Sequence, residues 1–300
     1  MTNKNNIDSK GIRSEKLGSL GIFLTALIWG YSFVAVKVVV EKVPPFYLVG
    51  FRNLLGGIFL ALIFFKYTKR TKLKDILLSL PVGIALFLGF FLQTMGAQFI
   101  TASKVAFFTG SNVIFVPFLV WIIYKKRPHI SSFIAAIITI IGLYFLTLAN
   151  GLNDVKIGDL FALLCAVAFA VHLILIDAVI EYVNGILMAI WQLIISGIIS
   201  LSFAVITKTH LNIEILSTEI IISFLYLSIA ASGIAYLLQT VSQKYVSVNK
   251  TSILLNMEAF LGALCGVIFM KDKLTFNFIL GGILVISAIF ICELGNNVNN

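Results

Sequence analysis

The chain has 300 residues, of which 60% are hydrophobic and 12% are charged, and its formal net charge is +9. This composition excludes a water-soluble globular protein, because so few polar residues cannot cover its surface. The charge does not indicate a nucleic-acid partner either, since the basic residues cluster beside apolar runs, as the positive-inside rule describes for membrane proteins.

Ten apolar spans of about 20 residues follow one another, each long enough to cross about 30 Å of hydrocarbon as a helix. A loose, basic tail is expected at 1–16, and the apolar run after it is too long for a signal-peptide core, so we expect it to be retained. The first five spans are expected at about 17–38, 45–65, 76–97, 103–124 and 130–149. After a linker at 150–156, the last five are expected at about 157–177, 185–206, 218–240, 249–270 and 275–294, before a tail at 295–300.

The basic residues also predict the orientation. If the N-terminus is cytoplasmic, the inner segments hold most of the lysines and arginines that lie outside the spans, and the first half supplies nearly all of this bias. The positive-inside rule therefore predicts that both termini are cytoplasmic.

The chain contains an internal repeat. The stretch that begins LQTMGAQFITASK at Leu92 matches LQTVSQKYVSVNK at Leu238, an offset of 146, and KLGSLG at Lys16 matches KIGDLF at Lys156, an offset of 140. Chance similarity between apolar helices is the alternative, but two long blocks with fixed offsets and matching polar residues argue against it. Since each half, 17–149 and 157–294, has an odd number of spans, the second must enter the membrane from the opposite side. The predicted fold is an all-α membrane protein with ten transmembrane helices in two inverted five-helix repeats.

Several segments resemble a known family. IWGYSFVAVK at 28–37, QTMGAQFITASKVAFFTG at 93–110, Arg52, Val116-Pro117 and the DKLT sequence at 272–275 are similar to the drug/metabolite transporter superfamily, EamA type. The resemblance implies ten helices in two EamA repeats, a location in the plasma membrane, and export or uptake of small metabolites, often amino acids. The family often has an acidic residue after the fourth and ninth spans; Asp272 fits, whereas Lys126 stands in the first half.

Ionisable groups inside the spans are functional candidates, because they are costly in hydrocarbon. Glu258 is a candidate coupling residue, either a proton-titrating group or a site for a substrate amine; alternatively it is a structural carboxylate bound to a buried donor. Lys37 is a second coupling candidate, although its place near a helix end also suits snorkelling to the interface. Arg52 is a candidate for carboxylate binding, or it pairs structurally with a helix-end carbonyl or with Glu41.

Uncharged side chains complete the predicted substrate site. Trp29 and Ser32 share a helix face and suit a pocket wall, although such stripes are more often packing. His172 stands where Ser32 stands in the first half, and is either a proton relay or a hydrogen-bonded strut. The remaining candidates, for a polar pocket at the repeat interface, are Gln93, Thr109, Asn112, Gln239 and Asn256. Pro117 is expected to kink the fourth span nearby.

Other classes of function have little support. The chain has no GxxxxGK[ST] loop for an ATP motor and no HExxH pair for a hydrolase, and Cys165, Cys265 and Cys292 lie inside spans without metal-ligand spacing. We therefore expect no enzyme activity, cofactor or metal. The favoured function is a secondary transporter that exports a small metabolite, an amino acid or related solute, by alternating access, driven by a proton or by the solute gradient. The alternatives are an uptake permease, a drug or nucleoside carrier of the same fold, an intramembrane enzyme, a channel or a scaffold. The expected partners are the solute, a proton and membrane lipids, with a monomer or a homodimer both open.

Overall fold

The computed structural model describes residues 2–147, 156–211, 217–270 and 275–298; at 2–12, 263, 265–270 and 293–298 it describes the backbone alone. The expected linker at 150–156, apart from Lys156, the DKL segment at 272–274 and the side chain of Cys265 lie outside the described residues. Every regular element in the described part of the chain is a helix, which confirms the predicted fold class.

The helices of the first half are α1 (Thr2–Gly30), α2 (Ser32–Val40), α3 (Pro45–Ile63), α4 (Phe65–Thr68), α5 (Leu73–Phe99), α6 (Ala102–Gly110), α7 (Asn112–Tyr124) and α8 (Ile130–Thr147). Those of the second half are α9 (Ile157–Val179), α10 (Gly185–Ile206), α11 (Thr218–Leu225), the π-helix η2 (Tyr226–Ile234), α12 (Ala235–Gln243), α13 (Val248–Leu255), α14 (Met257–Met270) and α15 (Phe276–Val298). Each predicted span coincides with one of these helices or with a run of two or three. Eight such stretches among the described residues are long and apolar enough to cross a membrane.

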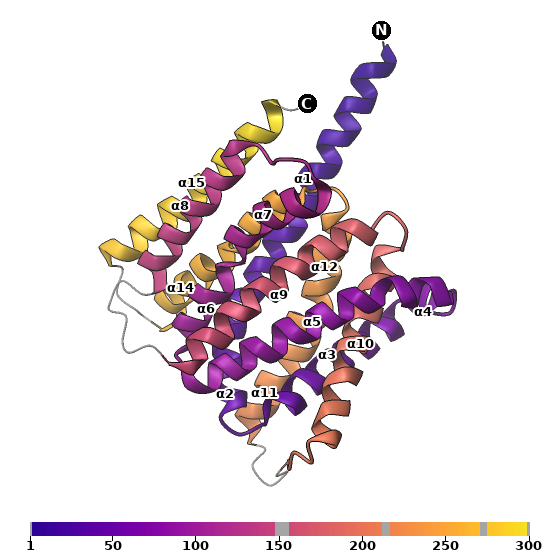
Figure 1. Ribbon diagram of the computed structural model, residues 1–300, viewed down its shortest axis with the longest axis vertical. Coiled ribbons are helices and arrows are strands. Elements are labelled where there is room, and N and C mark those ends of the chain that lie inside the picture. The colour runs from indigo at the N-terminus through magenta and orange to yellow at the C-terminus, as the bar shows by residue number, and fades with distance from the viewer. Residues whose placement is uncertain (1, 148–155, 212–216, 271–274, 299–300) are drawn as a thin grey trace.

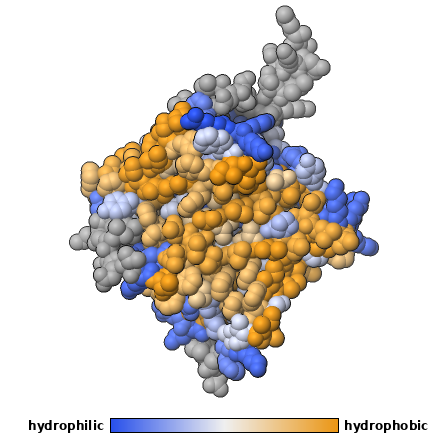
Figure 2. All heavy atoms as spheres, in the orientation of Figure 1, coloured by the Kyte–Doolittle hydropathy of each residue, from blue (hydrophilic) through white to orange (hydrophobic). Residues whose placement is uncertain are grey.

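The surface is apolar where lipid would touch it. Large hydrophobic side chains such as Leu62, Ile122, Val205 and Phe276 are strongly exposed. Figure 2 shows a broad hydrophobic face with polar residues at its margins. In water this exposed apolar surface would promote aggregation, whereas in a bilayer it would face the lipid chains.

One sequence-based expectation differs from the structure. The predicted loose tail at 1–16 is helical from Thr2, because a helix that is already nucleated in an apolar span extends at little further cost. In the fourth span Pro117 lies inside α7, where the expected kink stays a prediction, and a break lies at Ser111, whose hydroxyl donates to the Phe107 carbonyl. Interior hydroxyls that bond back to the preceding turn often bend helices.

The two halves interlock. The pairs α8–α15 and α3–α10 form two opposite edges of the bundle (Figure 1), and each pair joins one half to the other. Between them, α1 packs on α12, α13 and α14 of the second half, while α9 packs on α5, α6 and α7 of the first. The first helix of each half is thus embedded in the other half.

The backbones of α1 and α9 contact helices of the other half closely, and the contacts lie at equivalent positions of the repeat. A Cβ atom on Gly158 would lie 2.9 Å from the Gly96 carbonyl oxygen, and one on Gly18 would lie 3.0 Å from the Ser242 carbonyl oxygen. Gly18 and Gly158 are repeat counterparts at the offset of 140, as are Gly96 and Ser242 at 146. Small residues at both contacts let α1 and α9 approach their partner helices closely.

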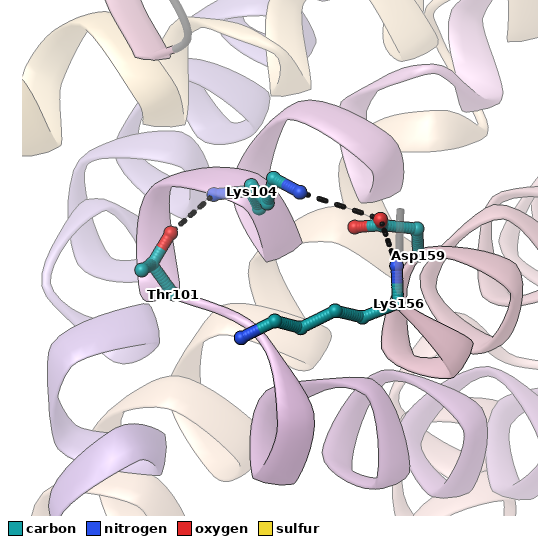
Figure 3. Close-up of polar contacts among 4 residues, drawn as sticks. All are labelled: Thr101, Lys104, Lys156 and Asp159. Atoms are coloured by element: carbon teal, nitrogen blue, oxygen red, sulfur yellow. Dashed lines mark hydrogen bonds and ion pairs between the residues drawn. The ribbon is translucent and has the colours of Figure 1, made fainter. Parts of the chain in front are cut away.

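Two ion pairs also follow the repeat. Lys104 Nζ lies 3.3 Å from Asp159 Oδ2 at the start of α9 (Figure 3), and Lys250 Nζ lies 3.0 Å from Glu15 Oε1 in α1. Lys104 and Lys250 are counterparts at the offset of 146, and each reaches the first helix of the other half. The Asp159 carboxylate also accepts a bond from the backbone N–H of Lys156. Because the spans of the two halves run in opposite senses, the pairs tie the bundle at opposite ends.

We expect Lys104→Met to lower the free energy of unfolding by about 3 kcal/mol, because it leaves the Asp159 carboxylate buried without its cation. The double variant Lys104→Met/Asp159→Asn removes that charge as well and should be more stable than the single variant. Thermal unfolding of the detergent-solubilised proteins measures both. Equal losses in the two variants would show that the buried charge is not the cause.

Candidate functional site

One cavity, partly open to the outside, lies between the two halves. Its lining from the first half is Trp29, Ser32, Phe33, Arg52, Phe90, Gln93, Thr109 and Asn112. Its lining from the second half is Phe169, His172, Leu173, Tyr236, Gln239, Leu255, Asn256 and Glu258. Both repeats therefore contribute polar and aromatic side chains to the same space.

All the residues that the sequence suggested as site residues, except Lys37, lie in this lining. That they bind a solute stays a prediction, but the structure brings them together from spans far apart in the chain. Sequence reasoning missed the aromatic part of the wall, chiefly Phe90, Phe169 and Tyr236. With 26 phenylalanines in the chain, those that face a cavity have no signal that separates them from those that face lipid.

Interrupted helices surround the cavity. The first span breaks at Tyr31, the fourth at Ser111 and the ninth at Asn256, and the last two breaks occupy nearly equivalent positions of the repeat. In the eighth span the π-helix η2 presents a carbonyl, since the indole Nε1 of Trp29 donates to the Ala231 oxygen at 2.8 Å. The Trp29 ring also lies 5.0 Å from that of Tyr236. Irregular backbone at membrane depth is tolerated where it lines a cavity, and here it holds Trp29 in the wall.

The cavity has an anionic side. Glu258 is the second residue of α14, and no described residue forms a hydrogen bond or ion pair with its carboxylate, so the expected alternative of a buried donor is not met in this part of the chain. The Asn256 amide nitrogen donates to the Ser252 carbonyl at 2.8 Å and to Asn112 Oδ1 at 3.4 Å. The Asn256 Oδ1 and Gln239 Oε1 oxygens are buried without a hydrogen-bond partner. Three acceptor groups of lining residues therefore lack a hydrogen-bond partner among the described residues.

The cavity also has a cationic side. Arg52 is 1% exposed, its Nε donates to Ser232 Oγ at 3.0 Å, and its guanidinium lies 4.1 Å above the centre of the Phe90 ring. The expected alternative of a pair with Glu41 is therefore wrong, since Glu41 is exposed and the bond goes to Ser232. No ion pair among the described residues joins Arg52 to Glu258. The lining thus holds an acidic and a basic side chain that do not pair with each other.

The neutral polar residues are held by their neighbours. Gln93 Nε2 donates to Thr109 Oγ1 at 3.4 Å, which ties α5 to α6. His172 Nε2 lies 2.8 Å from Gln192 Oε1, while the Gln192 amide nitrogen donates to Thr240 Oγ1 at 2.8 Å. Because an amide oxygen can only accept, His172 donates to it from Nε2. His172 is thus a hydrogen-bonded part of the wall.

Lys37 lies outside the cavity. Its ammonium donates to the Ala97 carbonyl at 2.8 Å and is 3.5 Å from the Ile100 carbonyl, at the C-terminal end of α5. A cation at this position offsets the partial negative charge of a helix C-terminus. Its repeat counterpart, Asp177, accepts a hydrogen bond from the Tyr124 hydroxyl at 2.8 Å.

Comparisons with known proteins agree with this architecture. The sequence model of the EamA-like transporter family matches the chain twice, at residues 16–148 and 156–293. An uncharacterized transporter of Archaeoglobus fulgidus is 31% identical over 275 residues, which is 92% of this chain and 85% of that protein. The uncharacterized transporter YoaV of Bacillus subtilis is 24% identical over 280 residues, 90% of this chain and 94% of that one.

A protein crystal structure shows the same fold. It superposes with a TM-score of 0.77 at 16% sequence identity, over 94% of this chain and 99% of that chain. Three findings support the same conclusion: two matches to one family model, a relative at 31% identity, and a cavity between two inverted repeats. The chain is a multi-pass membrane protein that belongs to the EamA-like transporter family.

Proposed function

We propose that this transporter carries a small neutral amino acid with an apolar side chain across the plasma membrane, by alternating access to the central cavity. The observation that supports this is a carboxylate and a guanidinium in one lining, neither of which forms an ion pair with a described residue, together with several aromatic rings. A solute that carries both charges would satisfy both groups at once.

The anionic side suits a primary ammonium group. Glu258, Gln239 Oε1 and Asn256 Oδ1 offer three acceptors, and an ammonium group has three N–H donors. An unpaired carboxylate in a cavity at membrane depth is destabilised. A cation that binds there removes this cost, which favours its binding.

The cationic side suits a carboxylate. The hydrogen bond from Arg52 Nε to Ser232 leaves the two terminal nitrogens of the guanidinium without a partner among the described residues. These nitrogens can bind the two oxygens of a carboxylate side by side, the strongest geometry for this pair.

Part of the remaining wall is apolar. Phe33, Phe90, Phe169, Leu173 and Leu255 offer hydrocarbon surface and no further charge. This favours a solute whose side chain is uncharged and apolar.

Proton coupling follows from the same carboxylate. A protonated Glu258 no longer attracts an ammonium group, so proton and solute exclude each other at this position. Such competition couples an inward proton gradient to export of the solute. With both termini in the cytoplasm, as the basic residues suggest, the carrier would work as a proton–solute antiporter.

The decisive experiment is counterflow of radiolabelled L-leucine, L-methionine and L-phenylalanine in proteoliposomes. We expect saturable counterflow of at least one of them, because a carrier must bind its solute on each turnover. Isopentylamine lacks the carboxylate of leucine and 4-methylpentanoate lacks its ammonium, so each should compete at least about tenfold more weakly than L-leucine itself. Equal competition by either analogue would contradict the two-charge site, and flux that never saturates would indicate a channel.

Glu258→Gln should lower counterflow by roughly 10- to 100-fold, the effect of losing a hydrogen bond to a charged group. The same variant should also lose the pH dependence of the remaining flux, while size-exclusion chromatography shows a folded protein. Glu41→Gln is the matched control, since Glu41 is exposed and outside the cavity. Wild-type flux with unchanged pH dependence in Glu258→Gln would refute the role in coupling.

Asn112→Ala should raise the solute concentration for half-maximal counterflow several-fold, because Asn112 lines the cavity and its oxygen accepts from Asn256. The yield of folded protein should change little. Thr139→Ala is the control, a fully buried polar residue that bonds only within α8. Loss of folded protein in place of the kinetic change would assign Asn112 a structural role.

A further inference from the structure

We propose that Ser232, Asn53 and Ser196 form a positioning relay that holds the Arg52 guanidinium, and that this relay sets the preference of the cavity for a carboxylate. None of the three residues lines the cavity. The specificity role rests on the proposed function, whereas the positioning of Arg52 can be tested without any solute.

The relay is a directed chain of hydrogen bonds across three helices. Arg52 Nε on α3 donates to Ser232 Oγ on η2 at 3.0 Å, and Ser232 Oγ donates to Asn53 Oδ1 at 3.1 Å. The Asn53 amide nitrogen then donates to Ser196 Oγ on α10 at 2.8 Å. Asn53, Ser196 and Ser232 are all 0% exposed.

The donor and acceptor groups of these residues agree with this direction of the hydrogen bonds. The guanidinium can only donate, so the Ser232 oxygen accepts and its hydrogen is free to point at Asn53. Asn53 must then present its oxygen to Ser232 and its nitrogen to Ser196. A satisfied network of this kind is worth most in a low-dielectric interior, where breaking one link leaves buried polar atoms unpaired.

The relay fixes the plane of the guanidinium. One edge is held through Nε, and one face lies on the Phe90 ring at 4.1 Å. The free nitrogens are then preorganised for the two oxygens of a carboxylate, and less side-chain entropy is lost when the solute binds. Without the Ser232 hydroxyl, the guanidinium keeps its charge but can rotate, and bidentate binding is weakened.

The π-helix makes the relay possible. Ser232 lies in η2, the wider helical segment, and Gly56 lets α3 lie directly against it: a Cβ atom on Gly56 would lie 2.6 Å from the Ser228 carbonyl oxygen. Two buried serines of η2, Ser228 and Ser232, differ in their partners. Ser228 donates to the Phe224 carbonyl within its own span, whereas Ser232 faces Arg52 and Asn53. The chain thus provides its own control.

Side-chain NMR of protein labelled with ¹⁵N-arginine tests the positioning. The chain has four arginines, and the Nε–H signal of Arg52 is assigned by its loss in Arg52→Lys. In Ser232→Ala we expect hydrogen exchange at this Nε–H to accelerate at least about tenfold, whereas Ser228→Ala should leave it unchanged. If Ser232→Ala does not fold, Ser196→Ala breaks the far end of the relay and should act in the same direction. Unchanged exchange in the relay variant that folds would overturn the proposal.

Counterflow tests the specificity. In Ser232→Ala the L-leucine concentration for half-maximal flux should rise about tenfold, while inhibition by isopentylamine, which has no carboxylate, stays unchanged. Ser228→Ala should change neither value. Equal losses for L-leucine and isopentylamine would overturn the role in carboxylate recognition. A wild-type protein that neither binds nor carries any of the three amino acids would refute the proposed function and this specificity role together, while the exchange experiment would still decide whether the relay holds Arg52.

Discussion

The exchange of first helices between the two halves is the constraint on which the rest of the structure depends. The α1 helix packs in the second half and α9 in the first, through contacts close enough to require Gly18 and Gly158. The same helices carry Trp29 and His172 into the space between the halves. The cavity is therefore a product of the interlock, and every lining residue depends on it for its place.

The frame of the molecule is symmetric, but its chemistry is not. The lysines at 104 and 250 and the breaks in spans four and nine match between the repeats. At mid-span the counterparts differ, since Arg52 corresponds to Gln192 and Asn112 to Glu258. One half thus supplies the basic side chain and the other the acidic one.

Much of the architecture was predictable from the sequence, because hydrocarbon imposes simple rules. Apolar runs flanked by charges give the spans to within a few residues, and the fixed offsets reveal the inverted repeat. Polar residues are so costly at this depth that those inside spans were good candidates for a cavity wall. Lys37 shows the limit of this rule, since helix-end carbonyls can also satisfy a buried charge. The aromatic wall and the bond from Arg52 to Ser232 were out of reach, because both depend on contacts between segments far apart in the chain, 180 residues apart for the bond. The π-helix has no signal in the sequence pattern either.

The interlock also has a consequence for biosynthesis. Trp29 bonds to a carbonyl 202 residues further along the chain, so at about 5–20 residues per second it waits roughly 10–40 s for its partner to be made. During that time the inner face of α1, with its small and polar residues, is in the membrane without the helices that cover it. The first half is therefore expected to need a membrane chaperone that covers the polar faces of its helices. The bundle can be completed only after the last spans have been inserted.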